Sequence, residues 1–212
     1  MNDINLREIE HNALEVSNLL FEKAGYNFRV SKLTIADLDW CRAMSRQQPK
    51  NKWIPWEFMG SLFYHKNSFN FCFKLLDLSN KPAAACMCQY SKVINAEQDY
   101  LDVEMIQNFA IKTSVLDGNT FRFALYTLIF FMRDARCHGI RVMSPINSKV
   151  ADYYINKYNF VDILGSKEIL YRDSKSLSAW LRVDVESRKS LIVSEQLLSD
   201  NENNDVNECL ED

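Results

Sequence analysis

Three β-rich runs follow one another in the middle of the chain, and only short polar loops separate them. The runs span Phe69–Leu76, residues 83–93 and residues 100–111. The first loop, residues 77–82, holds Asp, Ser, Asn and Pro, and the second, residues 95–99, is also short and polar. Loops of this length join strands that pair in antiparallel order. The sequence therefore predicts a three-stranded antiparallel meander.

After the meander the pattern changes to helices that alternate with single strands. We expect a very apolar helix that Gly139 ends, and a second helix that the Asn147 side chain caps at its N-terminus. The expected ranges are a helix over 122–138, a strand over 140–145, a helix over Ser148–Tyr158 and strands over 160–164 and 168–172. Strand, helix, strand after a meander predicts an α/β (α+β) fold. Its twisted sheet should be mixed, mostly antiparallel, with a central parallel pair flanked by helices.

An amphipathic helix is predicted at the N-terminus, ahead of the meander. Five apolar residues lie three and four positions apart, and Gly25 supplies the stop. They are Leu6, Ile9, Ala13, Val16 and Leu20. We expect this helix to pack on its own domain, and an interface for a homodimer or a protein partner is the alternative. A strand over residues 26–33 and a helix that Thr34 and Asp37 begin should follow.

Composition is that of a globular chain, since 47% of the 212 residues are apolar and 25% are charged. We expect an N-terminal helix over 1–25, a core domain over 26–173, a helical appendage over 174–198 and a disordered acidic tail over 199–212. Residues 200–212 contain six acids and no base. The longest apolar run is far shorter than the roughly 20 residues that cross a bilayer. With no basic-then-apolar segment at the N-terminus, we expect a cytoplasmic protein that does not enter the membrane.

The six cysteines do not form a pattern typical of a disulfide framework. We expect most of them to act as small apolar fillers. Cys86 and Cys88 should point to the same face of a strand, which raises the question of metal binding. No matching Cys/His pair lies nearby, so we expect no metal.

The order of the elements is similar to that of the GNAT superfamily of acyl-CoA N-acyltransferases, over residues 26–172. The segment Ser-Pro-Ile-Asn-Ser-Lys-Val-Ala-Asp-Tyr-Tyr, residues 144–154, carries the resemblance most clearly, with Tyr-Asn-Phe at 158–160. The family usually has Gly where this chain has Asn159, and here the helix is one residue longer before Phe160. Asn tolerates left-handed backbone nearly as well as Gly, so the first departure is mild.

The resemblance implies a cleft where the fourth strand splays away from the fifth and the pantetheine arm of CoA lies in the gap. The exposed backbone of the fourth strand would bind that arm, and the Asn147 side chain would touch it. The strand residues concerned are Asn108, Phe109, Ala110 and Ile111. The implied co-substrate is acetyl-CoA or another acyl-CoA, without a metal.

The resemblance also implies an acid and a base for acyl transfer. Tyr154 would protonate the departing thiolate, and Glu104 would take the proton of the acceptor ammonium. Asp102 is the second candidate for the base, because alternation places Glu104 on one face with Asp102, Ile106 and Asn108. The alternative for Tyr154 is that it is a core aromatic residue. The alternative for Glu104 and Asp102 is that they are exposed acids on a strand.

The loop that should hold the CoA pyrophosphate departs most from the family. The phosphate-binding candidates are Gly118, Asn119, Thr120, Phe121 and Arg122. If Gly118 keeps its usual place, Thr120 and Arg122 replace two glycines that would let the backbone approach the phosphates. Asp117 adds a negative charge, for which Arg122 and Lys112 could compensate. This degenerate loop could bind CoA weakly, bind another acyl carrier, or bind no phosphate.

The sequence does not identify the acceptor of the acyl group. Residues 29–92 contain ten Lys/Arg and four Asp/Glu, interleaved with Trp53, Trp56 and His65. A solvated basic face is a more common reason for such a pattern than nucleic-acid binding. The leading hypothesis is an N-acyltransferase that acts on a small-molecule amine or a protein. The alternative is an inactive GNAT-like module that binds a protein partner through the N-terminal helix and the C-terminal appendage.

Overall fold

The computed structural model describes residues 5–58, 68–77, 80–92, 98–109, 116 and 118–187. Residues 1–177 form one compact unit that includes the N-terminal helix, and residues 178–212 form a second unit. In the second unit, residues 178–187 are helical. None of the described helices is long and apolar enough to cross a membrane.

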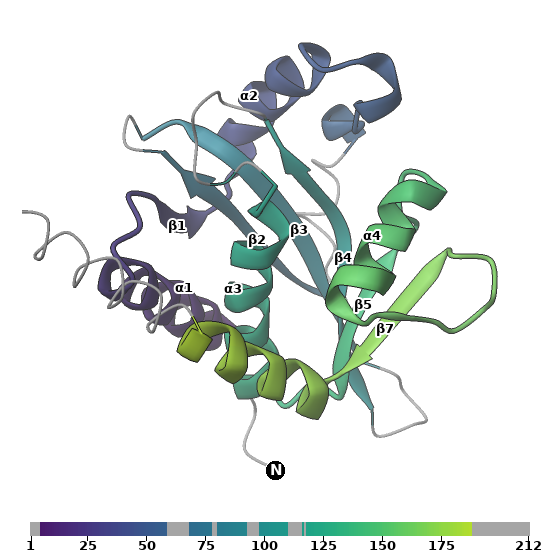
Figure 1. The fold of residues 1–212 in the computed structure, drawn as a ribbon. Coiled ribbons are helices and arrows are strands. Elements are labelled where there is room, and N and C mark those ends of the chain that lie inside the picture. Colours follow the sequence, from purple (N-terminus) through teal and green to yellow (C-terminus); the bar gives the residue numbers. More distant parts are fainter. Residues whose placement is uncertain are drawn as a thin grey trace, which may run out of the picture. The chain divides into compact units, whose positions relative to one another are not determined.

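The first unit is built on a sheet whose described strands run in the order β1-β2-β3-β4-β5-β7-β6 (Figure 1). Only the central pair, β4 and β5, is parallel, and β2, β3 and β4 form the predicted meander. The strands are β1 (Arg29–Lys32), β2 (Phe69–Leu76), β3 (Pro82–Lys92), β4 (Asp99–Asn108), β5 (Gly139–Met143), β6 (Val161–Asp162) and β7 (Ile169–Asp173). The predicted fold class, a mixed and mostly antiparallel sheet with a central parallel pair, is therefore confirmed.

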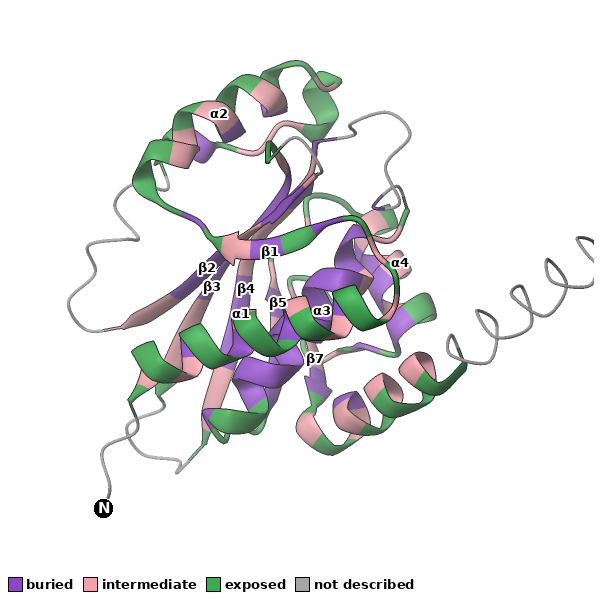
Figure 2. Cartoon of the chain, turned by 90° about the vertical axis from the view of Figure 1, so that its left-hand side faces the viewer, coloured by how far each residue is buried: buried purple, intermediate pink, exposed green. Residues whose placement is uncertain are grey.

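Helices cover both faces of this sheet. They are α1 (Leu6–Lys23), α2 (Ile35–Arg46), a short 3₁₀ turn (Lys50–Lys52), α3 (Thr120–Asp134) and α4 (Ser148–Tyr158). The ring of Phe71 on β2 stacks on Phe131 of α3, whereas its neighbour Cys72 lies in a cluster with Cys41 of α2. Because successive strand residues point to opposite faces, α2 and α3 lie on opposite sides of the sheet. Figure 2 shows α3 buried along most of its length.

The cysteines support the core as small side chains. Cys41, Cys72, Cys86, Cys88 and Cys137 are free and buried, as expected for fillers. Cys86 and Cys88 do share a face of β3, and their sulfur atoms lie 3.5 Å apart. Among the described residues, no group of three or more His, Cys, Asp or Glu side chains could hold a metal ion.

Helix α1 packs on its own domain, against α3 and β1, as predicted. The Asn18 amide donates to the carbonyl of Val30 (2.9 Å) and accepts from the Val30 N–H (2.7 Å). It therefore pairs the backbone groups of Val30 on the outer edge of β1. The predicted stripe is one residue out of phase, because Val16 is 40% exposed. The buried residues of α1 are Glu10, Ala13, Ser17 and Phe21.

Polar side chains on this buried face explain the error. The Ser17 hydroxyl donates to the Ala13 carbonyl within the helix (2.7 Å), and the Glu10 carboxylate pairs with Lys32 (2.6 Å). The Ser17 hydroxyl therefore enters the interface with its hydrogen bond made within the helix. The Glu10 carboxylate instead gains its partner, Lys32, from β1, and its second oxygen has no hydrogen-bond partner among the described residues. A pattern of apolar residues alone does not detect such positions.

Gly139 does not end a helix, as the sequence predicted, but begins β5. Helix α3 ends at Asp134, and Arg136 makes the turn with a left-handed backbone (φ 57°). A Cβ on Gly139 would lie 2.4 Å from the Arg172 carbonyl oxygen and 2.6 Å from the Tyr171 ring. Glycine is thus required here by close packing of β5 on β7.

Gly139→Ala is expected to lower the free energy of unfolding by about 1–3 kcal/mol, because the added methyl group must displace backbone. Urea denaturation would measure the change. Gly165→Ala is the matched control, since no atom lies within 4 Å of its added Cβ and only its backbone (φ 75°) would be strained. Equal losses of unfolding free energy in the two variants would show that the close approach of Arg172 is not the reason for glycine at position 139.

Candidate functional site

The parallel pairing of β4 and β5 covers only the first part of β4. It runs from Tyr100 opposite Gly139 to Val103 opposite Val142. In the pairing with β3, Val103 lies opposite Cys88 and Met105 opposite Met87. Glu104 therefore has no partner of its own and forms a β-bulge, which bends a strand and increases its twist. Beyond the bulge, β4 diverges from β5.

The bulge overturns the predicted alternation along β4. Asp102 lies opposite Gln89, whereas Ile106 lies opposite Cys86, an odd number of residues away. Asp102 and Ile106 therefore point to opposite faces of the sheet, with Asn108 on the side of Ile106. The prediction that Glu104, Asp102, Ile106 and Asn108 share one face is wrong, because one extra residue reverses the phase of every side chain after it.

Two hollows adjoin the gap between β4 and β5, and we call them the larger and the smaller hollow. The larger hollow has a volume of about 520 Å³, and the smaller one about 320 Å³. The larger hollow is lined by the predicted site residues Asn108, Gly118, Thr120, Phe121, Asn147 and Tyr154. The smaller hollow contains Glu104. The two hollows share Ile54, Ile106, Ile146, Val150 and Tyr154.

Tyr154 lies on this shared boundary, one helical turn from the end of α4. Its side chain is 6% exposed, and its ring packs on Phe121 with the ring centres 4.4 Å apart. Its hydroxyl makes no hydrogen bond with any described residue, so it remains available to a ligand. Burial raises the pKa of the Tyr154 phenol, and Cys86 and Tyr153 raise it further. The phenol therefore carries its proton at neutral pH.

Glu104 lies half-buried in the smaller hollow. Its carboxylate makes no ion pair or hydrogen bond within the described part of the chain. Burial raises the pKa of Glu104, the negative charge of Asp102 raises it further, and the Arg141 guanidinium lowers it. A carboxylate whose pKa is shifted toward neutrality can accept a proton more readily than an ordinary surface acid.

Asp102, the second candidate for the base, has a structural role. It is 4% exposed and lies in neither hollow. Its two oxygens accept from Arg141 at 2.6 and 2.7 Å, and the Ser91 hydroxyl adds a third hydrogen bond (2.6 Å). These contacts are those of a buried ion pair that joins β3, β4 and β5.

The degenerate loop leads directly into α3, which begins at Thr120, two residues earlier than predicted. Gly118 has a left-handed backbone (φ 69°), and its carbonyl accepts from the hydroxyl of Tyr153 (3.4 Å) and from Lys157 (3.5 Å). The Thr120 hydroxyl donates back to the Leu116 carbonyl (2.9 Å). Thr120 and Phe121, in the first turn of α3, line the larger hollow, so this helix N-terminus faces it.

Of the other predicted cofactor residues, the three that the structure describes line neither hollow. Phe109 is in the core beside Trp56, and its carbonyl accepts from the Gln48 amide (3.1 Å). Asn119 and Arg122 are not among the lining residues. Ala110 and Ile111 lie outside the described residues, as do Lys112 and Asp117.

Asn147 caps α4 as predicted, since its side-chain oxygen accepts from the Val150 N–H (3.1 Å). Its side-chain nitrogen is left to donate a hydrogen bond to a ligand in the larger hollow. At the other end of α4, Asn159 is in the left-handed region (φ 51°), which fits its place in the position where the family usually has Gly.

Two lysines of the larger hollow were not predicted. Lys52 comes from the 3₁₀ turn after α2, and Lys149 from the first turn of α4. Neither forms an ion pair with a described residue. Lys149 could have been suspected, because it lies two residues after Asn147, but nothing in the sequence brings Lys52 to the same place.

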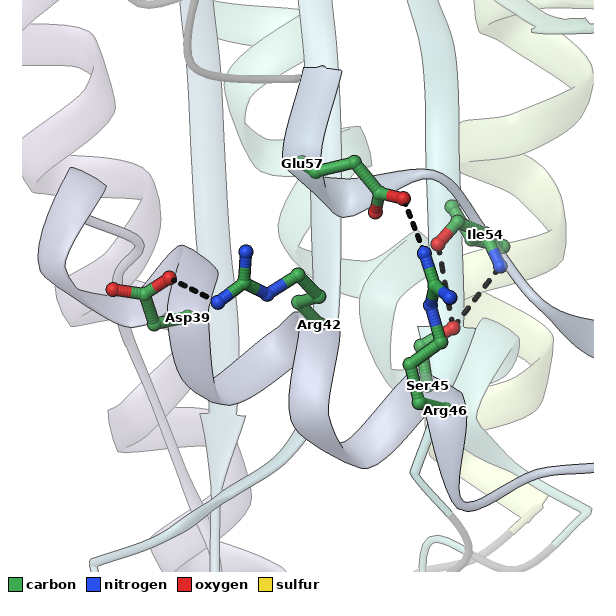
Figure 3. A network of polar contacts seen from close by, with 6 residues as sticks. All are labelled: Asp39, Arg42, Ser45, Arg46, Ile54 and Glu57. Carbon is green, nitrogen blue, oxygen red and sulfur yellow. Dashed lines mark hydrogen bonds and ion pairs between the residues drawn. The ribbon is translucent and has the colours of Figure 1, made fainter.

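The segment after α2 is fixed in position by polar contacts (Figure 3). The Arg46 guanidinium donates to Glu57 (2.5 Å) and lies 4.7 Å from the centre of the Trp53 ring. The Ser45 hydroxyl accepts from the Ile54 N–H (3.0 Å) and donates to the Ile54 carbonyl (3.3 Å). Trp53 and Ile54 line the smaller hollow, so this side of it is preformed.

The same segment is tied to β4. The indole N–H of the fully buried Trp56 donates to the Gln107 side-chain oxygen (2.6 Å), and the Gln107 amide donates to the Lys52 carbonyl (2.9 Å). The Gln107 side chain on β4 thus holds both Lys52 and Trp56, which lie at the two ends of this segment.

Neither a protein-family model nor a curated protein matches the sequence. Solved structures match the fold. The GNAT family N-acetyltransferase YhbS from Escherichia coli, in complex with CoA, aligns with a TM-score of 0.53 at 7% identity, over 72% of this chain and 85% of that one. AtaTR bound with acetyl-CoA aligns with a TM-score of 0.53 at 12% identity, over 73% and 98%.

A chimera of spermidine N-acetyltransferase SpeG from Vibrio cholerae and hSSAT aligns with a TM-score of 0.50 at 14% identity, over 71% of this chain and 98% of that one. At these low identities the likeness is one of fold. The chain has the fold of the GNAT acetyltransferases.

Proposed function

We propose that this protein transfers an acyl group from an acyl-CoA to an amine. The observation that carries the proposal is the place of Tyr154. Tyr154, whose hydroxyl makes no hydrogen bond with a described residue, lines both the larger hollow, with most of the predicted CoA residues, and the smaller hollow, with Glu104. An acid and a base thus lie on two sides of the point where donor and acceptor would meet.

Each group has one proton to move. Glu104, directly or through a water molecule, would take a proton from the acceptor ammonium, which leaves a lone pair on the amine nitrogen. That nitrogen would attack the thioester carbonyl carbon, the tetrahedral intermediate would lose its second nitrogen proton to water, and its carbon–sulfur bond would break to leave the amide. Tyr154 would give its proton to the departing thiolate and regain one from solvent. Tyr154 enters the reaction protonated, and the raised pKa of Glu104 makes its carboxylate more basic, as its role requires.

Charge and a helix N-terminus could hold the CoA phosphates in place of the missing glycines. The first turn of α3 faces the larger hollow, and the positive end of a helix dipole favours an anion. Lys52 and Lys149 would add two positive charges in the same hollow. The Asn147 amide and the backbone of β4 near Asn108 would lie beside the pantetheine arm. Acetyl-CoA or another acyl-CoA is the expected donor.

The alternative, an inactive module that binds a protein partner through its N-terminal helix and its C-terminal appendage, receives less support from the N-terminal helix. The inward face of α1 is covered by α3 and β1 of the same chain. What α1 exposes, including Val16 and Leu19, is the opposite and more polar side. No residue of that face accounts for the phenol and the carboxylate beside the gap in the sheet, neither of which makes a hydrogen bond with a described residue.

The pH dependence of turnover tests the role of Glu104. A base is lost when it becomes protonated, so kcat/KM should fall as the pH drops through the Glu104 pKa. Because that pKa is raised, the fall should begin above the usual range for Glu, near 4.3. Glu104→Gln should lower kcat by about 100-fold and remove this acidic limb. Release of the CoA thiol, followed with a thiol reagent against pH, measures both.

Asp102→Asn is unsuitable as a control, because it would leave Arg141 without its buried partner. Glu168→Gln is a better one, since Glu168 is exposed and lines neither hollow. The same acidic limb in wild type and Glu104→Gln would contradict the assignment of Glu104 as the base.

A further inference from the structure

The smaller hollow has a distinctive balance of charge. Fourteen described residues line it, and eleven of them are apolar. The others are Glu104, Ser144 and Tyr154, and Tyr154 is uncharged. Glu104 is therefore the one charged group among the described lining residues. A ligand that matches this hollow carries one positive charge and is otherwise apolar, since a second charge would lose its hydration without gaining a partner.

The apolar part of the hollow has a defined shape. Trp53 lies beneath the Arg46 guanidinium, and its indole N–H donates to the Gln48 carbonyl (2.7 Å). The backbone of Ile54 is held on both sides by Ser45. Met105 and Met143 complete the hollow from β4 and β5, and methionine adapts to apolar ligands of varied outline. Because its aromatic side is already ordered, binding requires little rearrangement there.

The volume sets the size of the ligand. About 320 Å³ corresponds to about ten water molecules at roughly 30 Å³ each. This is at the lower end of the range of ligand pockets, about 300–1,000 Å³. It suits a small molecule with a ring or a short alkyl chain.

We propose that the acceptor is a small primary amine with a single cationic nitrogen on an apolar, preferably aromatic, body. Glu104 would pair with the ammonium group, and Trp53, Met105 and Met143 would contact the body. This inference rests on the proposed acyl transfer and specifies its acceptor. It predicts that Trp53 and its neighbours determine specificity, and that diamines and polyamines are poor ligands.

Calorimetry on the full chain tests the inference directly. The probes are 2-phenylethylamine, ethylamine and putrescine, each titrated alone and in the presence of saturating CoA. We expect 2-phenylethylamine to bind at least tenfold more tightly than either of the others, because each buried methylene adds about fourfold in affinity. Equal or tighter binding of putrescine would overturn the inference, and so would no detectable binding of 2-phenylethylamine under both conditions.

Thiol release from acetyl-CoA, measured with the same amines, separates this inference from the proposed function. Tight binding of 2-phenylethylamine without thiol release would contradict acyl transfer but support the selectivity of the hollow. Thiol release that is faster with putrescine would support acyl transfer and overturn the selectivity.

A pair of variants places the amine in this hollow. Ser144 is exposed and lines the smaller hollow but not the larger one, so Ser144→Glu should fold and add a second carboxylate at the rim of the smaller hollow. We expect this variant to bind 2-phenylethylamine about tenfold more weakly and putrescine more tightly than wild type does. Ile163→Glu is the matched control, because Ile163 is 49% exposed and lies in neither hollow. Wild-type affinities in Ser144→Glu, with folding verified by circular dichroism, would overturn the assignment of the site.

Discussion

Tyr154→Phe is expected to lower kcat by about 100-fold or more and to leave the KM for acyl-CoA within about twofold of wild type. The hydroxyl makes no hydrogen bond with the described residues, so its removal should not disturb the fold. The ring, which packs on Phe121 and Phe160, remains. What is lost is the proton for the departing thiolate. Steady-state kinetics with acetyl-CoA and a saturating amine would measure the change.

Tyr153→Phe is the matched control, because the adjacent phenol lines the same larger hollow. Its hydroxyl contacts the Gly118 carbonyl (3.4 Å) and the Tyr158 hydroxyl (3.2 Å). Loss of these contacts should alter the loop at Gly118, and hence the KM for acyl-CoA, more than kcat. A fall in kcat and in affinity by the same factor for Tyr154→Phe would instead indicate that its phenol has a structural role.

Trp56→Ala is expected to lower the free energy of unfolding by about 3–5 kcal/mol. Trp56 is fully buried in a cluster with Leu33, Cys41, Cys72 and Phe109. Its removal leaves a large cavity and takes away the hydrogen bond that the Gln107 oxygen accepts. For a domain of this size, the loss corresponds to a fall in Tm of about 6–20 °C. Chemical and thermal denaturation would measure it.

Trp56→Phe separates the two contributions. It keeps most of the apolar contact and removes only the indole N–H, so we expect a smaller loss, about 1–3 kcal/mol. A loss below about 1 kcal/mol for Trp56→Ala would contradict the view that this residue fixes the segment beside the smaller hollow.

Local signals predicted the elements whose ends are determined by nearby residues. Ser148–Tyr158 and Phe69–Leu76 have the predicted bounds. Asn147 and Asn159 define α4 at both ends through side-chain capping and a left-handed turn, and both effects act within a few residues. Thr34 and Asp37 likewise begin α2, since the Asp37 carboxylate accepts from the Thr34 N–H (2.8 Å).

Features that depend on contacts between distant segments were not predicted. The bulge at Glu104 arises where β4 pairs with β3 on one side and leaves β5 on the other, and no residue type in the sequence marks it. Glycine at 139 predicts a helix end, because glycine often has that role. Instead, Arg136 makes the turn after α3, and glycine is needed at 139 because a Cβ there would clash with the Arg172 carbonyl. Lys52 reaches the larger hollow only because Gln107 holds its backbone from β4.

Calorimetric titration of the full chain with CoA tests most directly whether the hollow beside the degenerate loop is a donor site. We expect saturable binding and a higher Tm with CoA, because a ligand at 100 times its Kd stabilises the folded state by about 2.7 kcal/mol. Lys149→Ala should weaken this binding, whereas Lys175→Ala, which alters an exposed lysine outside both hollows, should not. No heat and no thermal stabilisation at millimolar CoA would contradict acyl transfer from CoA by this protein.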